Sequence, residues 1–563
     1  MTADIVRRPV PDTAAMLAQA GIAPVLARIY AARGVRTASE LDLELTQLPS
    51  WTTFKGIDAA AARLAAAIER RERMLIVADY DADGATACAI GVRGLRAMGA
   101  EVGFLVPNRF EFGYGLTPEI VALAATREPA LIITVDNGIA SVEGVAAARA
   151  RGIDVLITDH HLPGAELPAT IWIVNPNQPG CGFPSRHLAG VGVMFYVLMA
   201  LRALLRERGR FAAGGEPNLA TLLDLVALGT VADVVQLDHV NRILVGQGLQ
   251  RIRAGRMQPG LRALFAAAGR DPTRATAYDL GFVAGPRLNA AGRLADMSIG
   301  IACLLADDEA AAEPLAAALD ELNRTRREVE ATMHEQALDG LDAMAAEDRY
   351  TLCVYRPDWH QGVVGIVASR LKERFHRPTI VFARGGDGEL RGSGRAIPGF
   401  HLRDALDLVA KRAPHLITRF GGHAFAAGLT LPEFALPQFS AEFERVAREW
   451  LSPSDLLQTL ETDGELDPVE VTLGLAQQIA AQVWGQGFPP PVFEGEFGVV
   501  EQRLVADKHL RLTLLAGGRP CAAIRFNEPG PLPGRIRAAY RVDVNHYQGL
   551  SSLQLVLERW QPA

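Results

Sequence analysis

The segment of the chain with the most evident chemistry is Asp79-Tyr-Asp-Ala-Asp-Gly84, in which three carboxylates alternate. A short apolar run, 74–78, leads directly into it, so the segment is interpreted as the tight turn after a buried strand. Such a density of negative charge is unfavourable unless cations neutralise it. The spacing therefore predicts a metal site at this turn, with the following helix beginning near Ala85.

The same Asp-x-Asp-x-Asp-Gly spacing also opens the calcium-binding loop of EF-hand proteins. An EF-hand has a glutamate at the twelfth loop position, where this chain has Ile90. A strand also precedes the motif, in place of a helix. Both observations argue against a calcium hand.

Residues of the same kind recur at matching places further along the chain. The apolar run 131–135 ends in Asp136, the run 155–158 ends in Asp159-His160-His161, and an apolar helix over 218–235 carries Asp233. The carboxyl ends of parallel strands meet at one edge of a sheet, where open α/β sheets bind their ligands. One aspartate after a strand is commonly a helix cap or turn former, but the repetition favours a single cluster.

The donor types indicate which ion the cluster would hold. Carboxylates and imidazoles suit Mn²⁺ or Mg²⁺, whereas structural zinc sites usually include thiolates. The five cysteines are scattered and form no Cys-x-x-Cys pair, which argues against a zinc knuckle or a disulfide framework. They fit a reducing, cytoplasmic location.

The elements that must position these residues follow an α/β pattern. Apolar runs rich in β-branched residues alternate with alanine-rich segments of helical period, at 74–78, 131–135, 155–158 and 171–174. This pattern predicts a parallel sheet in a domain over 51–307, after an N-terminal arm over 1–50. Two apolar helices, 190–205 and 218–235, belong to the same domain.

Three further parts follow this domain. Residues 308–347 are interpreted as a connecting helix, with Leu315, Leu319 and Met333 on one apolar face. Runs at 351–355 and 378–383 open a smaller α/β domain, 348–452, and strand-like runs between Gly/Pro turns predict a β-barrel over 453–563. The barrel aromatics that either fill its core or stack on bases are Phe493, Phe497, Phe526, Tyr540 and Tyr547.

The overall composition sets limits on the function. The chain of 563 residues has 57 basic and 64 acidic side chains and a net charge of -7, so any nucleic acid must be bound locally. No apolar run reaches the ~18 to 20 residues that a membrane span needs, and the first residues lack a signal core. These features predict a soluble, ordered enzyme without membrane contact.

In their order along the chain, DYDADG, VDNG, DHH and GTVAD resemble the DHH phosphoesterase superfamily. Later motifs narrow the resemblance to the RecJ group of single-strand-specific 5′ to 3′ DNA exonucleases, and it covers nearly the whole chain from about Phe54. These motifs are PNRFEFGYG (107–115), GPRLNAAGRL (285–294), WHQGVVGIVASR (359–370), RGSGRAIPGFHL (391–402) and RFGGHAFAAGL (419–429). The last three belong to the second, DHH-associated domain, DHHA1.

The resemblance implies a role for each residue of the cluster. Two divalent ions would be held by Asp81, Asp83, Asp136, His160 and Asp233, with Asp136 between the ions and Asp79 as an auxiliary ligand. The candidate catalytic residues are Asp136, Asp159 and His161, of which His161 would contact the scissile phosphate or assist proton transfer. Several branches of the superfamily have a histidine where this chain has Val77, so the first ion is expected to have fewer protein ligands.

The resemblance also implies a pocket for the 5′-phosphate of the strand. Guanidinium groups and glycine-rich backbone suit a terminal phosphate. The candidates are Arg109, Arg287, Asn289, Arg293, Ser393, Arg395, Gly422 and His423. For each arginine the alternative is a surface ion pair, and for His423 it is a capped turn; Trp359 and His360 either stack a base or fill an interface.

We therefore expect an exonuclease that holds single-stranded DNA between the metal edge and the second domain, with an oligonucleotide-binding (OB) barrel on the downstream strand. It would release 5′-mononucleotides in recombination and repair, as a monomer, with a single-stranded-DNA-binding protein and a helicase as partners. One alternative is an enzyme for short oligonucleotides, cyclic dinucleotides or pyrophosphate, which the barrel disfavours. The other is a DNA-binding scaffold with an inactive site, which the complete ligand set disfavours.

Overall fold

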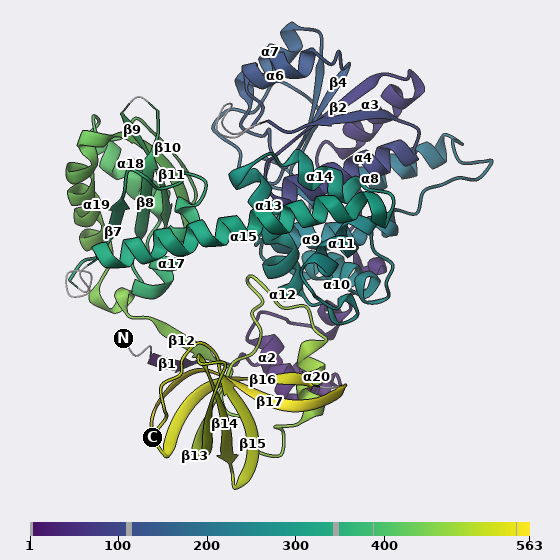
Figure 1. The fold of residues 1–563 in the computed structure, drawn as a ribbon. Coiled ribbons are helices and arrows are strands. Elements are labelled where there is room, and N and C mark those ends of the chain that lie inside the picture. The colour runs from purple at the N-terminus through teal and green to yellow at the C-terminus, as the bar shows by residue number, and fades with distance from the viewer. Residues whose placement is uncertain (1–3, 108–114, 342–347, 387, 548) are drawn as a thin grey trace. The chain divides into compact units, whose positions relative to one another are not determined.

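The computed structural model describes residues 4–107, 115–341, 348–386, 388–547 and 549–563, which form two compact units (Figure 1). The larger unit holds residues 7–323 and 462–563. The smaller unit holds residues 324–461 and the described residues before Arg7. The predicted metal cluster and the barrel therefore belong to the same unit.

The larger unit contains a five-stranded parallel sheet in the order β3-β2-β4-β5-β6. This confirms the predicted α/β fold. Its strands are β2 (Arg73–Ala78), β3 (Glu101–Leu105), β4 (Leu131–Val135), β5 (Asp154–Thr158) and β6 (Ile173–Val174). Two strands differ from prediction: β3 was missed because Glu101 and Gly103 interrupt its apolar run, and β6 is shorter than 171–174 because Ile171 is exposed.

Alternating side chains of the sheet pack into two separate layers. Leu75 and Val77 face the helices α6 (Pro118–Ala125) and α7 (Val142–Ala150). Met74 and Ile76 face the larger layer, whose helices are α3 (Ile57–Glu69), α4 (Ala82–Ala97), α8 (Gly190–Glu207) and α9 (Leu223–Ala232). Both faces of the sheet are thus covered, as its continuous apolar strands require.

Helix α4 begins at Ala82, so the predicted start near Ala85 is wrong. The reason is the carboxylate of Asp81, which accepts hydrogen bonds from the backbone N–H groups of Asp83 and Gly84 and caps the helix. Asp83 consequently lies inside the first helical turn.

A run of helices follows α9 in the larger unit: α10 (His239–Arg253), α11 (Pro259–Ala267), α12 (Ala277–Asp279), the π-helix η6 (Leu280–Ala284), α13 (Gly285–Leu294) and α14 (Ser298–Leu305). The predicted connecting helix is α15 (Glu309–Gly340), with Leu319 and Met333 buried. Among the described helices, none combines the length and apolarity needed to cross a membrane.

The smaller unit is built on a mixed sheet in the order β10-β11-β9-β8-β7. Strands β7 (Leu352–Tyr355) and β8 (Thr379–Arg384) are parallel, and β9 (Glu389–Arg395), β10 (Arg419–Gly422) and β11 (Ala426–Pro432) continue the sheet antiparallel. Its helices are α17 (Val364–Phe375), α18 (Leu402–Arg412) and α19 (Leu436–Trp450). Strand β1 (Asp4–Arg7) pairs with β12 (Thr459–Thr462) in a separate two-stranded sheet.

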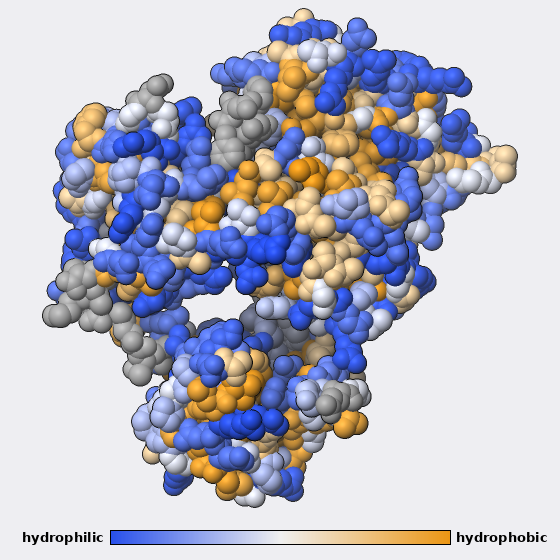
Figure 2. All heavy atoms as spheres, in the orientation of Figure 1, coloured by the Kyte–Doolittle hydropathy of each residue, from blue (hydrophilic) through white to orange (hydrophobic). Residues whose placement is uncertain are grey.

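A closed barrel completes the larger unit, in the strand order β13-β14-β15-β17-β16, after helix α20 (Leu473–Ala480). The strands are β13 (Phe493–Val505), β14 (His509–Ala516), β15 (Arg519–Arg525), β16 (Arg535–Tyr547) and β17 (Leu550–Pro562). Phe493, Phe497 and Tyr540 are buried and fill the barrel core, whereas Phe526 and Tyr547 are exposed. Apolar groups lie among hydrophilic ones on the visible face of the barrel (Figure 2).

The residues predicted as an N-terminal arm fold as α1 (Thr13–Gln19) and α2 (Pro24–Ala31) and pack beside the barrel. Tyr30 of α2 stacks with Trp484 and Phe488 from the segment that leads into the barrel. Arg33 donates two hydrogen bonds to the carboxylate of Asp463, and both side chains are about 1% exposed. This buried ion pair joins the first segment of the unit to the start of its second segment.

Replacing Arg33 by Ala should lower the free energy of unfolding of the larger unit by about 3–5 kcal/mol, because Asp463 would stay buried without its main cation. Chemical denaturation of the full chain would measure the change. Arg412→Ala is the matched control, since its ion pair with Glu449 lies at the surface and should leave the midpoint nearly unchanged. Equal effects of the two variants would contradict the prediction.

Candidate metal centre

The predicted acidic residues come from strand ends and helix ends at one edge of the parallel sheet. Asp79 follows β2, Asp136 follows β4, and Asp159-His160-His161 follows β5. Asp81 and Asp83 stand at the start of α4, and Asp233 caps the end of α9. The structure brings all of these residues together, as the sequence predicts.

His160 lies at the centre of the cluster. Its Nε2 atom is 3.1 Å from Oδ1 of Asp136, 3.5 Å from Oδ2 of Asp233 and 4.0 Å from Oδ2 of Asp83. Ligand atoms lie within 4.8 Å of one another in three groups: Asp83 with His160 and Asp233, Asp79 with Asp81 and Asp136, and Asp136 with His160 and His161. This donor set fits hard divalent cations.

Asp136 and Asp79 have a special place in these groups. Asp136 belongs to two of the three groups, as does His160. The position of Asp136 between two ions stays a prediction. Asp79 lies at ligand distance from Asp81 and Asp136. Its carboxylate is therefore available to an ion for which this chain, with Val77, lacks the histidine found in other branches of the superfamily. The sequence predicted Asp79 only as an auxiliary ligand.

Backbone N–H groups hold the carboxylate of Asp83. Gly190 and Val191 donate to it over 2.6 Å and 2.8 Å from the first turn of α8. A helix N-terminus stabilises negative charge, so this contact offsets part of the cost of burying Asp83. No sequence pattern indicates this contact, because it depends on how α8 packs on α4.

Asp136 adopts a strained backbone conformation, with φ at +62°. The amide of the next residue, Asn137, fixes this turn by donating to the backbone oxygens of Val77 and Val135. Gly190 is also required here, because a Cβ at that position would lie 2.7 Å from the Cβ of Asp136. The turn and the helix start therefore fit together only without a side chain on Gly190.

Asp159 organises the turn after β5. Its carboxylate accepts the backbone N–H groups of Ile139, His160 and His161 and lies 2.8 Å from Nδ1 of His161. Because its oxygens are engaged in this way, Asp159 is suited to orienting His161. Its assignment as a catalytic residue stays a prediction.

Two asparagines that the sequence analysis missed hold the backbone of the turn after β5. Asn175 donates to the backbone oxygen of His161, and Asn177 donates to that of His160. Both residues follow β6, at the same edge of the sheet as the acidic turns. That position was the signal that could have identified them.

Burial and mutual repulsion dominate the electrostatics of the carboxylates. Burial, followed by the charge of Asp81, raises the pKa of Asp83 to about 7. Burial and the neighbouring carboxylates also raise the pKa values of Asp136 and Asp233 well above the usual range. A cluster of this kind needs cations to become fully ionised.

The pair formed by Asp159 and His161 behaves in the opposite way. Burial opposes ionisation of both groups, but their mutual hydrogen bond and the nearby charges outweigh it. The pKa of Asp159 is held below its ordinary value, and the pKa of His161 is raised to about 9. His161 is therefore a proton donor at neutral pH in the ion-free protein.

Helix α13 lies directly on the Asp79–Gly84 turn. The side-chain oxygen of Asn289 accepts the N–H of Ala82, and a Cβ on Gly292 would lie 1.8 Å from the backbone oxygen of Tyr80. Arg287 is ion-paired with Asp320 of α15 at 2.7 Å, and Arg293 lies in the last turn of α13. The contacts of these residues with DNA stay predictions.

The smaller unit gathers four of the other predicted phosphate ligands at one end of its sheet. Arg395 donates to Oγ of Ser393 and to the backbone oxygen of Gly394, and burial lowers the pKa of Arg395. Burial is the one cause of that shift, and no carboxylate of the described residues contributes to it. Gly422 has φ at +140°, and His423 begins the turn that leads into β11.

Three further residues were candidates for contact with the DNA strand. Arg109 lies outside the described residues. Trp359 is buried and donates to the side chain of Gln336, so it fills the interior of the smaller unit. Nδ1 of His360 accepts the N–H of Gly362.

Comparison with known proteins identifies the family. Residues 73–230 match the DHH family N-terminal domain, residues 348–449 the DHHA1 domain and residues 462–559 the RecJ OB domain. The single-stranded-DNA-specific exonuclease RecJ of Dickeya dadantii is 52% identical, over 96% of each chain. That of Escherichia coli is 48% identical, over 99% of this chain and 98% of its own. The chain belongs to the RecJ family.

Solved RecJ structures agree with the fold and with the expected ions. RecJ of Thermus thermophilus in complex with Mn²⁺ has a TM-score of 0.84 at 30% identity and covers 100% of this chain and 80% of that chain. Its Mg²⁺ complex has a TM-score of 0.78 at 28% identity, covering 100% of this chain and 78% of that chain. The predicted choice of Mn²⁺ or Mg²⁺ is confirmed at the level of the family.

The affinity for Mn²⁺ should rise as the pH is raised from about 5.5 to about 7.5, because an ion must displace the protons that Asp83, Asp136 and Asp233 hold below their raised pKa values. Titration calorimetry in two buffers of different ionisation enthalpy should also detect protons released on binding. An affinity independent of pH, with no proton release, would contradict this account.

Proposed function

We propose that the protein is a metal-dependent exonuclease that removes 5′-mononucleotides from the 5′ end of single-stranded DNA by two-metal hydrolysis. The observation that carries the proposal is the cluster of carboxylates and imidazoles at the sheet edge, in a chain of the RecJ family. The complete donor set argues against an inactive scaffold. The closed barrel argues against a substrate as small as pyrophosphate.

In this proposal the two ions are held by Asp79, Asp81, Asp83, Asp136, His160 and Asp233, with Asp136 shared. When bound, the ions polarise the scissile phosphate and lower the pKa of a water molecule. The protein fixes their positions through the N–H groups that hold Asp83 and the strained turn at Asp136.

His161 has the second chemical role. Its side chain is 32% exposed, and Asp159 fixes the ring through Nδ1. In its protonated form His161 would hydrogen-bond to a phosphate oxygen or protonate the leaving 3′-oxygen. Asp159 acts through His161 as a positioning residue.

Recognition of the 5′ end is assigned to the smaller unit. Arg395 and Ser393 lie side by side on β9, and a Cβ on Gly365 at the start of α17 would be 2.9 Å from Oγ of Ser393. A guanidinium free of carboxylates beside a helix start and the glycine turn at Gly422 and His423 suits a terminal phosphate. Arg109, Arg287, Asn289 and Arg293 are proposed as further contacts to the strand.

The proposal includes partners and a place of action. An enzyme confined to single strands needs other proteins to supply them, so we propose that a helicase and a single-stranded-DNA-binding protein work with it. The process would be DNA recombination and repair in the cytoplasm, with the chain acting as a monomer.

A time course with Mn²⁺ on a single-stranded oligonucleotide labelled at its 3′ end tests the proposal, with a circular strand and a blunt duplex beside it. The linear strand should give a descending ladder, while the circle and the duplex stay intact. Cleavage of the circle would contradict exonuclease action, and rapid loss of the duplex would contradict single-strand specificity.

Asp136→Ala should abolish turnover while leaving binding of single-stranded DNA largely intact, because Asp136 belongs to two ligand groups and lies 1% exposed below the surface. Nuclease assays and fluorescence anisotropy would measure the two properties separately. Wild-type cleavage by this variant would show that the metal assignment is wrong.

Arg395→Gln should remove the preference for a 5′-phosphate, with a rate on phosphorylated strands at least about tenfold lower and little change on 5′-hydroxyl strands. Rates on the two substrates would be compared for the variant and the wild type. Arg391→Gln, on the same strand with an exposed side chain, is the matched control. A variant that keeps the full preference would exclude Arg395 from the phosphate pocket.

A further inference from the structure

Two aromatic side chains of the larger unit are exposed in a way that packing does not explain. Tyr278 is 60% exposed and Phe282 is 70% exposed. Their ring centroids lie 4.9 Å apart and their planes differ by 22°, so the rings stack on each other. An apolar surface of this size is unfavourable in water and commonly marks a binding site.

The segment that carries the pair is firmly held. Tyr278 belongs to α12 and Phe282 to η6, four residues apart and thus on the same helical side. The residues between and around them, including Ala277, Leu280 and Ala284, are buried. The backbone of Tyr278 is fixed further by the capping box of Thr276 and Asp279. Insertions of π-helix are frequently found at functional sites.

The pair is supported by the residues that lead to the metal ligand Asp233. A Cβ on Gly281 would lie 3.1 Å from Cγ1 of Val231, and a Cβ on Gly285 would lie 3.0 Å from the Cβ of Ala232. Val231 and Ala232 directly precede Asp233, and the residue after it, Val234, is 62% exposed. The segment that carries the aromatic pair therefore packs against the residues that lead to a metal ligand.

We propose that Tyr278 and Phe282 form a stacking platform for a base of the DNA strand that lies on the 3′ side of the scissile phosphate, beyond the first nucleotide there. This rests on the proposed function. A 5′ exonuclease that releases mononucleotides has one nucleotide on the 5′ side of the cleaved bond. The end of that nucleotide is assigned to Arg395 and Ser393, so a further contact to the strand is placed on the 3′ side. Two nearly parallel rings provide a face on which a base continues the stack.

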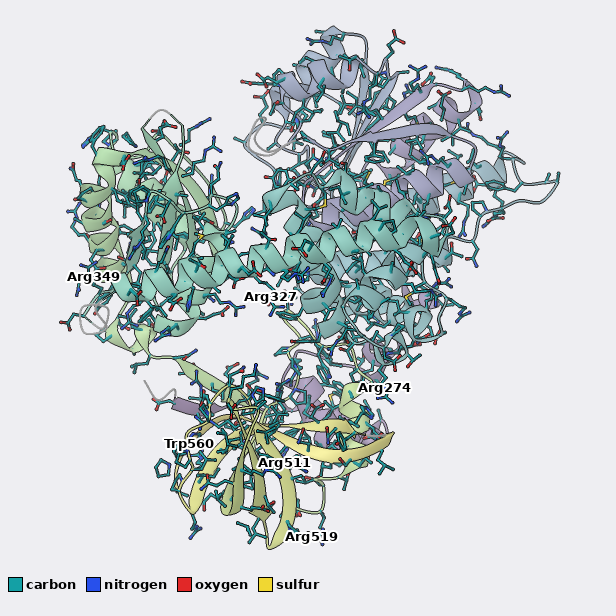
Figure 3. The ribbon with its side chains drawn as sticks, in the orientation of Figure 1. Arg274, Arg327, Arg349, Arg511, Arg519 and Trp560 are labelled. Carbon is teal, nitrogen blue, oxygen red and sulfur yellow. The ribbon has the colours of Figure 1, made fainter. Side chains whose placement is uncertain are left out.

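The chemistry of the platform suits a substrate of any sequence. Every base has a π-face, and Phe282 has no polar atom with which to select one base. Arg274 (Figure 3) precedes Tyr278 by four residues, is 56% exposed in its side chain and lies 3.8 Å from its carboxylate partner Asp271. This cation is available to a backbone phosphate beside the stacked base.

The test compares wild type with the double variant Tyr278→Ala/Phe282→Ala on two 5′-phosphorylated substrates, a dinucleotide and a strand of about 20 nucleotides. The KM for the long strand should rise about tenfold, in the range found when one base loses its aromatic partner. The kcat/KM for the dinucleotide should change less than about twofold, because its only base on the 3′ side is joined directly to the scissile phosphate and no base lies further along the strand to stack. Phe282→Trp should keep the wild-type KM.

The matched control is Phe434→Ala, which removes another exposed aromatic ring, 82% exposed, on the smaller unit. This variant should keep the wild-type KM for the long strand and the wild-type kcat/KM for the dinucleotide. Melting temperatures of all variants should equal that of the wild type, because the removed side chains lie at the surface.

A series of long strands, each with one abasic position, gives an independent readout. Wild type should bind the strand more weakly when the abasic position is at one particular place on the 3′ side. The double variant should bind that strand as well as it binds an intact one. An unchanged KM of the double variant on the long strand, or an equal loss on the dinucleotide, would overturn the platform. Failure of wild type to cleave either strand would instead overturn the proposed function.

Discussion

The structure depends on keeping several buried carboxylates within a few ångströms of one another. Burial and mutual repulsion favour their protonated forms, as the raised pKa values of Asp83, Asp136 and Asp233 show. A protonated cluster cannot hold cations, so the protein must supply donors that favour negative charge. The N-terminus of α8 does this for Asp83, and three backbone N–H groups do it for Asp159. Bound cations would complete the compensation.

This requirement explains why helices far along the chain belong to the site. Gly190 brings α8 against Asp136, and Gly292 brings α13 against the backbone of Tyr80, at distances that exclude any side chain. The sheet edge alone supplies carboxylates, but their positions are fixed by these two helix contacts. A motif glycine at such a place meets a packing requirement and need not touch the substrate.

The sequence predicted the central strands, the metal cluster and the barrel, because apolar runs ending in acidic residues identify strands and their carboxyl ends without tertiary information. It missed β3, whose Glu101 and Gly103 break the pattern, and the supporting amides of Asn175 and Asn177. The ion pairs of the arginines in these motifs depend on tertiary packing. Arg287 is paired with Asp320, whereas Arg395 has neighbours without negative charge, and only the packing of α15 decides this difference.

The roles of the aromatic residues also depend on tertiary packing and could not be predicted from the sequence. Phe493, Phe497 and Tyr540 were candidates for stacking on bases, but they fill the barrel core. The exposed pair on α12 and η6 has no distinctive sequence pattern, and its role follows only from the buried residues around it. The glycines beside that pair pack on Val231 and Ala232, which support Asp233. In the proposed platform, the segment that would bind the base thus packs against the end of α9, the helix that presents Asp233.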